Sequence, residues 1–87
     1  MQLDGHIISG EFDESANAFL LRKVKHLSTA SILNKKQLHA LTDYLHKHKH
    51  EDDGQVLTLY DQILVRLNQE EVEHFLNDLD KVKTWYH

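Results

Sequence analysis

The chain of 87 residues has no cysteine and no proline, and only three glycines. Without cysteine it has neither disulfides nor thiolate metal clusters, so its stability must come from a packed core. Proline and glycine interrupt helices, and their scarcity therefore favours a helical protein. No apolar run in the sequence approaches the roughly 20 residues of a membrane-spanning helix, so we expect no membrane partner.

Catalytic and sorting motifs are absent as well. The sequence contains no glycine-rich phosphate loop, no GxSxG, no HExxH and no cysteine nucleophile, so we expect no enzymatic activity and no cofactor. Its first residues, MQLDGHIISG, include an early acid and no basic residue, unlike a secretory signal. A charged fraction of 28% beside 40% hydrophobic residues is ordinary for a folded domain, and we expect a cytoplasmic location.

Charge is unevenly distributed along the chain. The net charge of −4 combines four acids and no base in residues 1–21, seven bases and one acid in residues 22–50, and nine acids and one base in residues 51–80. Lys81 and Lys83 complete the sum. Two interpretations fit this order: basic and acidic helices that lie side by side and neutralise each other, or a polarised surface that attracts a charged partner.

Capping signals predict two helices. Asn34 is followed three residues later by Gln37, and Asn68 is followed at the same distance by Glu71, as in capping boxes. The first of these helices should end near His50. Their apolar stripes are Leu38, Leu41 and Leu45 in the first, and Val72, Phe75, Leu76, Leu79, Val82 and Tyr86 in the second.

Apolar spacing predicts two more helices. Asp13 is suited to cap a helix that ends near Leu27, and Gly54, which can adopt a positive φ, precedes a helix over residues 55–67. The polar residues at Asn68 favour a break before the last helix, although one continuous helix stays open. The apolar positions are Ala16, Phe19, Leu20, Val24 and Leu27, and then Val56, Leu57, Leu59, Tyr60, Ile63, Leu64 and Leu67.

Together these signals predict an all-α protein, a compact antiparallel bundle of about four short helices. Residues 1–12 are expected to form a short N-terminal arm, and residues 13–87 a single helical bundle domain. The arm is preferred to a strand because no second strand is predicted nearby for it to pair with.

Several polar side chains share one face of the helix that begins at Asn34. At 100° per residue an arc of about 60°, opposite the leucines, contains His39, Asp43, His46 and His50. We therefore expect these side chains in solvent. Their spacing suits a divalent metal, but an exposed helix face offers few supporting hydrogen bonds, so we predict no metal site. Whether this face binds metal weakly or senses pH stays open.

The start of the same helix is basic and polar, as in helices that read DNA from their first turns. The candidates for nucleic-acid contact are Asn34, Lys35, Lys36, Gln37 and His39. The connector before this helix is long for a helix-turn-helix, and the chain is net acidic. DNA binding through phosphate contacts is therefore an alternative function rather than the main prediction.

The C-terminal helix offers a different surface. Trp85 and Tyr86 are 100° apart on a helix, so Tyr86 continues the apolar stripe while Trp85 projects elsewhere. An aromatic side chain in that position either seals the edge of the core or anchors an interface. The acidic face of this helix would oppose a basic partner. The candidate protein interface is Trp85, Tyr86, Glu70, Glu73 and Asp80, with Asp78 on its flank.

In size and layout the chain resembles small antiparallel helical immunity and regulatory proteins of Gram-positive bacteria and their phages. The resemblance rests on the stretch YLHKHKHEDDG (residues 44–54), the apolar segment after it and the aromatic C-terminus. The charge segregation, Trp85 and Tyr86, and the missing catalytic motifs together predict a small non-enzymatic regulatory or inhibitory protein that binds another protein. A DNA-binding regulator and a small helical immunity protein are the alternatives, and homodimer formation stays open.

Overall fold

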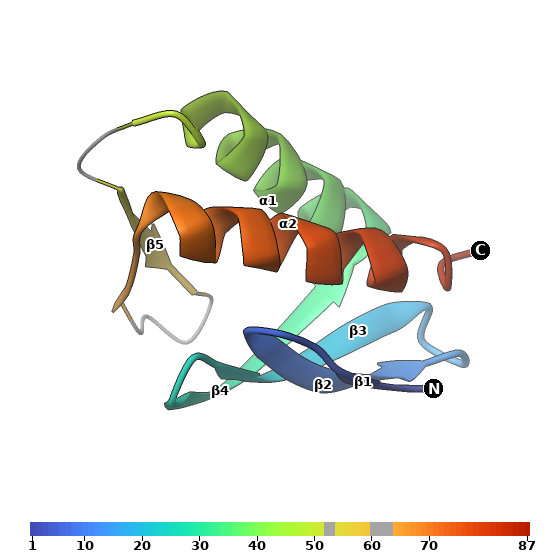
Figure 1. The fold of residues 1–87 in the computed structure, drawn as a ribbon. Helices are drawn as coiled ribbons and strands as arrows, with labels where there is room; N and C mark the ends of the chain where they lie inside the picture. The colour runs from blue at the N-terminus through green and yellow to red at the C-terminus, as the bar shows by residue number, and fades with distance from the viewer. Residues whose placement is uncertain (52–53, 60–63) are drawn as a thin grey trace.

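The structure, a computed structural model, describes residues 1–51, 54–59 and 64–87. In these ranges a four-stranded antiparallel sheet is followed by a helix, a two-stranded hairpin and a second helix (Figure 1). The elements are β1 Gln2–Asp4, β2 Ile8–Asp13, β3 Ala18–Val24, β4 Leu27–Asn34, α1 Lys35–His48, β5 Gln55–Thr58, β6 Leu64–Leu67 and α2 Gln69–Lys83.

The prediction of an all-α helical bundle is wrong, because the described residues form six strands and only two helices. Residues 13–27, expected as a helix, contain the end of β2, a turn and β3, and residues 55–67 contain β5 and β6. The expected core positions Tyr60 and Ile63 lie outside the described residues. Residues 1–12, expected as an arm, contribute β1 and most of β2. Because the chain forms a sheet, it does not have the antiparallel helical layout on which the resemblance to immunity proteins rested.

The strands β1 to β4 pair in chain order as an antiparallel meander. Alternate residues point toward the helices. The cross-strand pairs Phe12–Phe19 and Phe19–Leu33 lie on this buried face. The register of β2 on β3 shifts between Ser9 and Gly10, and that of β3 on β4 also shifts once. Such bulges increase the local twist, which helps a sheet to curve around the helices it packs against.

Two turns of this meander adopt positive φ at residues other than glycine. Asn17 has φ 51° after β2, and Lys25 has φ 58° between β3 and β4. Asp13 accepts hydrogen bonds from the backbone N–H groups of Ser15 (3.0 Å) and Ala16 (3.3 Å). This is the bond expected of a helix N-cap, but here it closes a turn between two strands.

Both helices begin where the capping signals predicted. The side chain of Asn34 accepts from the N–H of Gln37, and that of Asn68 accepts from the N–H of Glu71, each at 2.8 Å. In return, the side chains of Gln37 and Glu71 accept from the N–H groups of the two cap residues at 2.9 Å. α2 therefore begins after Asn68, as the capping signal predicted, but the segment before it is β6 rather than a third helix.

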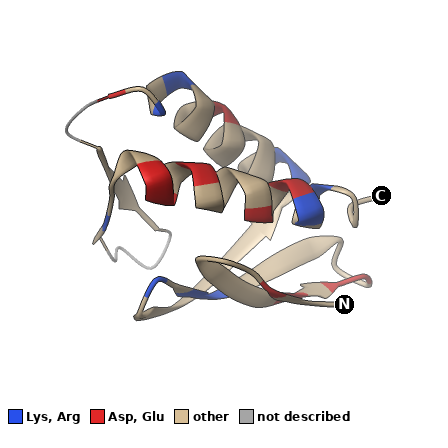
Figure 2. Ribbon diagram, viewed as in Figure 1, with Lys and Arg blue, Asp and Glu red and all other residues tan. Residues whose placement is uncertain are grey.

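The two helices lie next to each other on one face of the four-stranded sheet (Figure 1). Acidic residues are concentrated on α2, and lysines lie at both ends of α1 (Figure 2). α1 and α2 are neighbours, as the first interpretation of the charge pattern requires, but no ion pair joins the two helices among the described residues. Neither described helix is long and apolar enough to cross a membrane.

The hairpin β5–β6 completes the core beside the helices. Gly54 precedes it with φ 74°, as expected, and a Cβ there would lie 2.3 Å from the backbone oxygen of Leu67. Gln55, which pairs with Leu67, is buried, and neither polar atom of its side chain has a hydrogen-bond partner among the described residues. The fully buried side chains at the centre of the protein include Phe19, Leu21, Leu33, Leu45, Val65, Leu67, Phe75, Leu79 and Val82.

Asp78 fastens the β1–β2 turn to α2. Its fully buried carboxylate accepts hydrogen bonds from the backbone N–H groups of His6 (3.1 Å), Ile7 (2.9 Å) and Ile8 (3.2 Å). A Cβ at Gly5 would lie only 2.4 Å from the Asp78 Cγ, so a larger residue would displace the carboxylate. The expectation that Asp78 lies on the flank of an exposed acidic face is wrong. Its carboxylate is buried, and hydrogen bonds from three backbone N–H groups take the place of hydrogen bonds from water.

Candidate functional site

The face of the four-stranded sheet opposite the helices carries exposed aliphatic side chains. Strand pairing places Glu11, Leu20 and Ile32 in one row across β2, β3 and β4. Ile32 is 61% exposed and Leu20 is half-buried, whereas Phe19 and Leu33, one residue away, are buried under the helices. No described helix lies on the outer side of this sheet (Figure 1). The described part of the fold therefore leaves Leu20 and Ile32 without a covering layer.

The residues around this row line a depression of about 350 Å³. We call this surface the open sheet face, and it comprises Glu11, Asp13, Ala16, Ala18, Leu20 and Ile32. Phe12 also borders the depression, but its ring is buried on the other face of the sheet. Pockets for small molecules usually enclose about 300–1,000 Å³ and bury most of the ligand. A depression at the low end of that range, bordered by the exposed Ile32, suits one or two side chains of a protein partner better than a buried small molecule.

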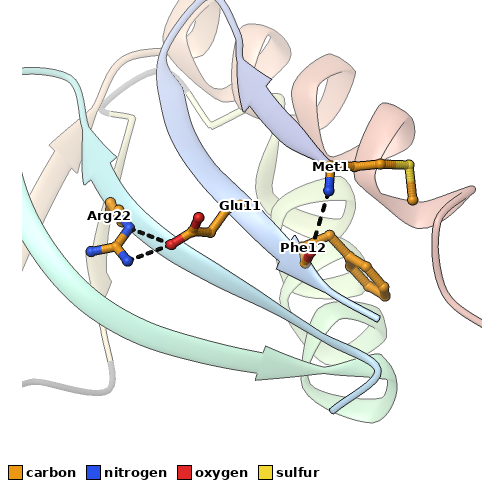
Figure 3. Close-up of polar contacts among 4 residues, drawn as sticks. All are labelled: Met1, Glu11, Phe12 and Arg22. Carbon is orange, nitrogen blue, oxygen red and sulfur yellow. Dashed lines mark hydrogen bonds and ion pairs between the residues drawn. The ribbon is translucent and has the colours of Figure 1, made fainter. Parts of the chain in front are cut away.

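The open sheet face is acidic at one end. Glu11 forms an ion pair with Arg22 on the neighbouring strand, and Arg22 Nε donates to Glu11 Oε1 at 3.0 Å (Figure 3). Asp13 uses Oδ1 to hold its turn. The second carboxylate oxygen of both acids has no hydrogen-bond partner among the described residues. The described lining contains no lysine, arginine or histidine, so these two carboxylates set its charge.

Figure 3 also shows how the end of this strand is held. The N-terminal amine of Met1 lies 3.5 Å from the backbone oxygen of Phe12, and the backbone N–H of Phe12 donates to the oxygen of Met1 at 2.7 Å. The strand that carries Glu11 and Asp13 is therefore paired on both sides, by β1 and by β3. A strand in the middle of a sheet is a rigid support for a binding surface.

Trp85 and Tyr86, the aromatic candidates for a protein interface, pack against the edge of the core. The ring of Phe12 lies edge-to-face against both, with centroids at 6.3 Å from Trp85 and 4.9 Å from Tyr86. The Tyr86 hydroxyl donates to the backbone oxygen of Leu33 at 2.7 Å. Burial raises the pKa of Tyr86 to about 12. Both aromatic residues are half-buried against the core, which matches the other role considered for them, sealing its edge.

The three acids predicted for the same interface are exposed on α2. Glu70 lies 3.6 Å from the Nε2 of His74, within its own helix. Glu73 and Glu70 line a hollow of about 270 Å³ together with Lys49 and His50 from the end of α1. Asp80 lies nearer the other end of α2. The acidic face therefore borders the basic end of α1 and lies on the opposite side of the molecule from the open sheet face.

Two of the five residues predicted to contact nucleic acid are engaged within the protein. The side chains of Asn34 and Gln37 form the capping box of α1. Lys35, Lys36 and His39 are exposed beside them. Only these three side chains remain to contact phosphates, and base recognition by Asn34 or Gln37 would require the cap to open.

The predicted histidine face is exposed, as expected, but α1 ends at His48, so His50 lies in the turn after the helix and only His39, Asp43 and His46 share the helix face. His39, His46, His50 and Asp43 all lie in solvent. Among the residues that the structure describes, no group of three or more histidines and acids is placed to hold a metal ion. His48 belongs to a different face: its Nδ1 lies 2.6 Å from Glu51 Oε1, and its ring packs against Tyr44.

Sequence reasoning missed the open sheet face because Leu20 was assigned to the core of a helix. A signal was present, since Glu11 and Asp13 alternate with Gly10 and Phe12 as in a half-buried strand. No protein-family model, no curated protein and no solved structure matches this chain. The geometry of the described residues therefore carries the functional argument.

Proposed function

We propose that this protein is a small non-enzymatic regulator or inhibitor, active in the cytoplasm, that binds another protein through the open sheet face. One observation carries the proposal: the row Glu11–Leu20–Ile32 crosses three strands on a face that no described helix covers. Single exposed aliphatic residues are common, whereas contiguous exposed apolar surface rimmed by polar residues marks interaction sites.

The support is stronger for this face than for the C-terminal interface predicted from the sequence. An anchor residue has to be available to the partner, and Ile32 is 61% exposed while Trp85 and Tyr86 are engaged with Phe12. Two of the three supporting strands, β2 and β3, pair on both sides, whereas β4, which carries Ile32, is an edge strand paired with β3. Rigid anchors lose little conformational entropy on binding, which favours affinity.

The test is affinity purification from the organism that encodes the protein, with three tagged forms in parallel. The wild type and Val56→Lys should retain the same stoichiometric protein, and Ile32→Lys should lose it. Val56 is the matched control, because it is also an exposed aliphatic residue, 48% accessible, but lies on the hairpin β5–β6. Equal retention by Ile32→Lys, or a partner removed by nuclease, would contradict the proposal. Circular dichroism of each form verifies that it is folded.

A further inference from the structure

We infer that the partner presents a basic segment to the open sheet face, with a lysine or arginine next to an aliphatic side chain. This inference rests on the proposed function and names the chemistry of the partner. It is drawn from the two unpaired carboxylate oxygens at the depression and from the charge of its lining, both described above.

The spacing of the two acids supports this assignment. Glu11 and Asp13 are two residues apart on β2, so their side chains leave the same face about 7 Å apart. An extended segment of a partner has the same repeat, so its alternate side chains can face both acids at once. Arg22 already neutralises part of Glu11 through Oε1, which leaves Asp13 as the less compensated acid. We therefore expect the partner's cation near Asp13 and its aliphatic side chain between Leu20 and Ile32.

A second copy of the chain fits this surface less well. A two-fold contact of the open sheet face with itself would bring Glu11 and Asp13 of both copies around one depression. Two Arg22 side chains would then oppose four carboxylates, and each Arg22 is already used within its own chain. Unbalanced like charges at an interface oppose association, so charge favours a basic partner over self-association.

The experiment selects random linear peptides, displayed on phage, against three purified baits. The baits are the wild type, the double variant Glu11→Gln/Asp13→Asn, and Ile32→Lys. Asn in place of Asp13 keeps a side-chain oxygen for the turn, so the double variant removes charge with little change of shape. Peptides enriched on the wild type should carry a lysine or arginine close to a valine, leucine or isoleucine. One enriched peptide is then synthesised, and its affinity for each bait is measured by calorimetry.

We expect the peptide to bind the double variant about tenfold more weakly than the wild type, with a reduced salt dependence. We expect no measurable binding to Ile32→Lys. Peptides without a basic preference, or with equal affinity for the double variant, would overturn the inference about charge while the proposed function stands. Equal affinity for Ile32→Lys would instead overturn the proposed binding surface itself. A wild-type dimer in light scattering that is absent in Ile32→Lys would assign this face to a second copy and also overturn the inference.

Discussion

The two faces of the four-stranded sheet use adjacent residues for opposite purposes. On the covered face, Phe19 and Leu33 are buried beneath the helices. On the open face, Leu20 and Ile32 remain accessible although they are equally apolar. The difference shows that apolar character alone does not define the core of this protein. The position of α1 and α2 decides which aliphatic residues stabilise the fold and which are available for binding.

Two of the buried polar side chains of the described residues are in contrasting states. Asp78 is satisfied by three backbone N–H groups, whereas Gln55 has no hydrogen-bond partner among the described residues. A buried polar group costs free energy unless it is hydrogen-bonded, so these two residues should have opposite effects on stability. Four substitutions test the contrast between the two faces and between these two residues.

The largest effect is expected at Asp78. Asp78→Ala removes the acceptor of three backbone N–H groups, of which that of Ile8 is buried and those of His6 and Ile7 are part-buried, and should lower the free energy of unfolding by about 3–5 kcal/mol. Chemical denaturation measures the change. Asp80→Ala, on the exposed side of α2, is the control and should change stability by less than about 0.5 kcal/mol. Similar values for the two variants would show that the covered face does not depend on this carboxylate.

The second effect is a gain of stability at Gln55. Gln55→Leu replaces an unpartnered amide by an apolar side chain of similar length and should raise the free energy of unfolding by about 1–2 kcal/mol. A higher midpoint of thermal or urea unfolding is the expected result. A lower midpoint would mean that the Gln55 amide has a partner in solution, such as a water molecule, which the substitution removes.

The third effect concerns Tyr86, which closes the edge of the covered face. Tyr86→Phe removes the hydrogen bond to Leu33 and should cost about 1 kcal/mol near neutral pH. Because burial raises the folded-state pKa of Tyr86 to about 12, the neutral phenol stabilises the fold below pH of about 10. That contribution should disappear as pH rises through about 12. Between these pH values the free energy of unfolding should therefore fall more steeply with pH for the wild type than for Tyr86→Phe. The same pH dependence in both proteins would contradict the assignment.

The smallest effect on stability is expected on the open face. Ile32→Ala should change the free energy of unfolding by less than about 0.5 kcal/mol, because the side chain is already mostly in solvent. Leu33→Ala, one residue along the same strand, should cost about 2–5 kcal/mol. Comparable losses at both positions would show that the open sheet face is covered in solution, either by residues outside the described ranges or by a second copy.

The sequence predicted both helix starts because a capping box is a local signal. Asn34 with Gln37 and Asn68 with Glu71 satisfy the first free amides of their own helices, whatever the rest of the chain does. Helical periodicity also predicted the exposed histidine surface of the first helix and the exposed acidic surface of the second, and both lie in solvent. Asp78 was misplaced, because its buried partners come from the opposite end of the chain and leave no mark on the local pattern.

The strands were mistaken for helices for two physical reasons. Leu20 and Leu64 are apolar residues on exposed faces, so they break the alternation that identifies a half-buried strand. The turns use Asn17 and Lys25 at positive φ, where a glycine would have signalled a hairpin. The hydrogen bonds of Asp13 were predicted correctly, but the same bonds close a turn as readily as they begin a helix.

The three hydrogen bonds between Asp78 and the β1–β2 turn also affect the order in which the chain folds. Its partners are separated by 70 to 72 residues, and the Tyr86–Leu33 bond by 53, so the first and last segments depend on each other. During synthesis the meander is made first, yet its opening turn lacks its acceptor until α2 has left the ribosome. Contacts of such long sequence separation slow folding, so we expect the nascent chain to acquire its native form only after Asp78 and Tyr86 have left the ribosome, in one cooperative step.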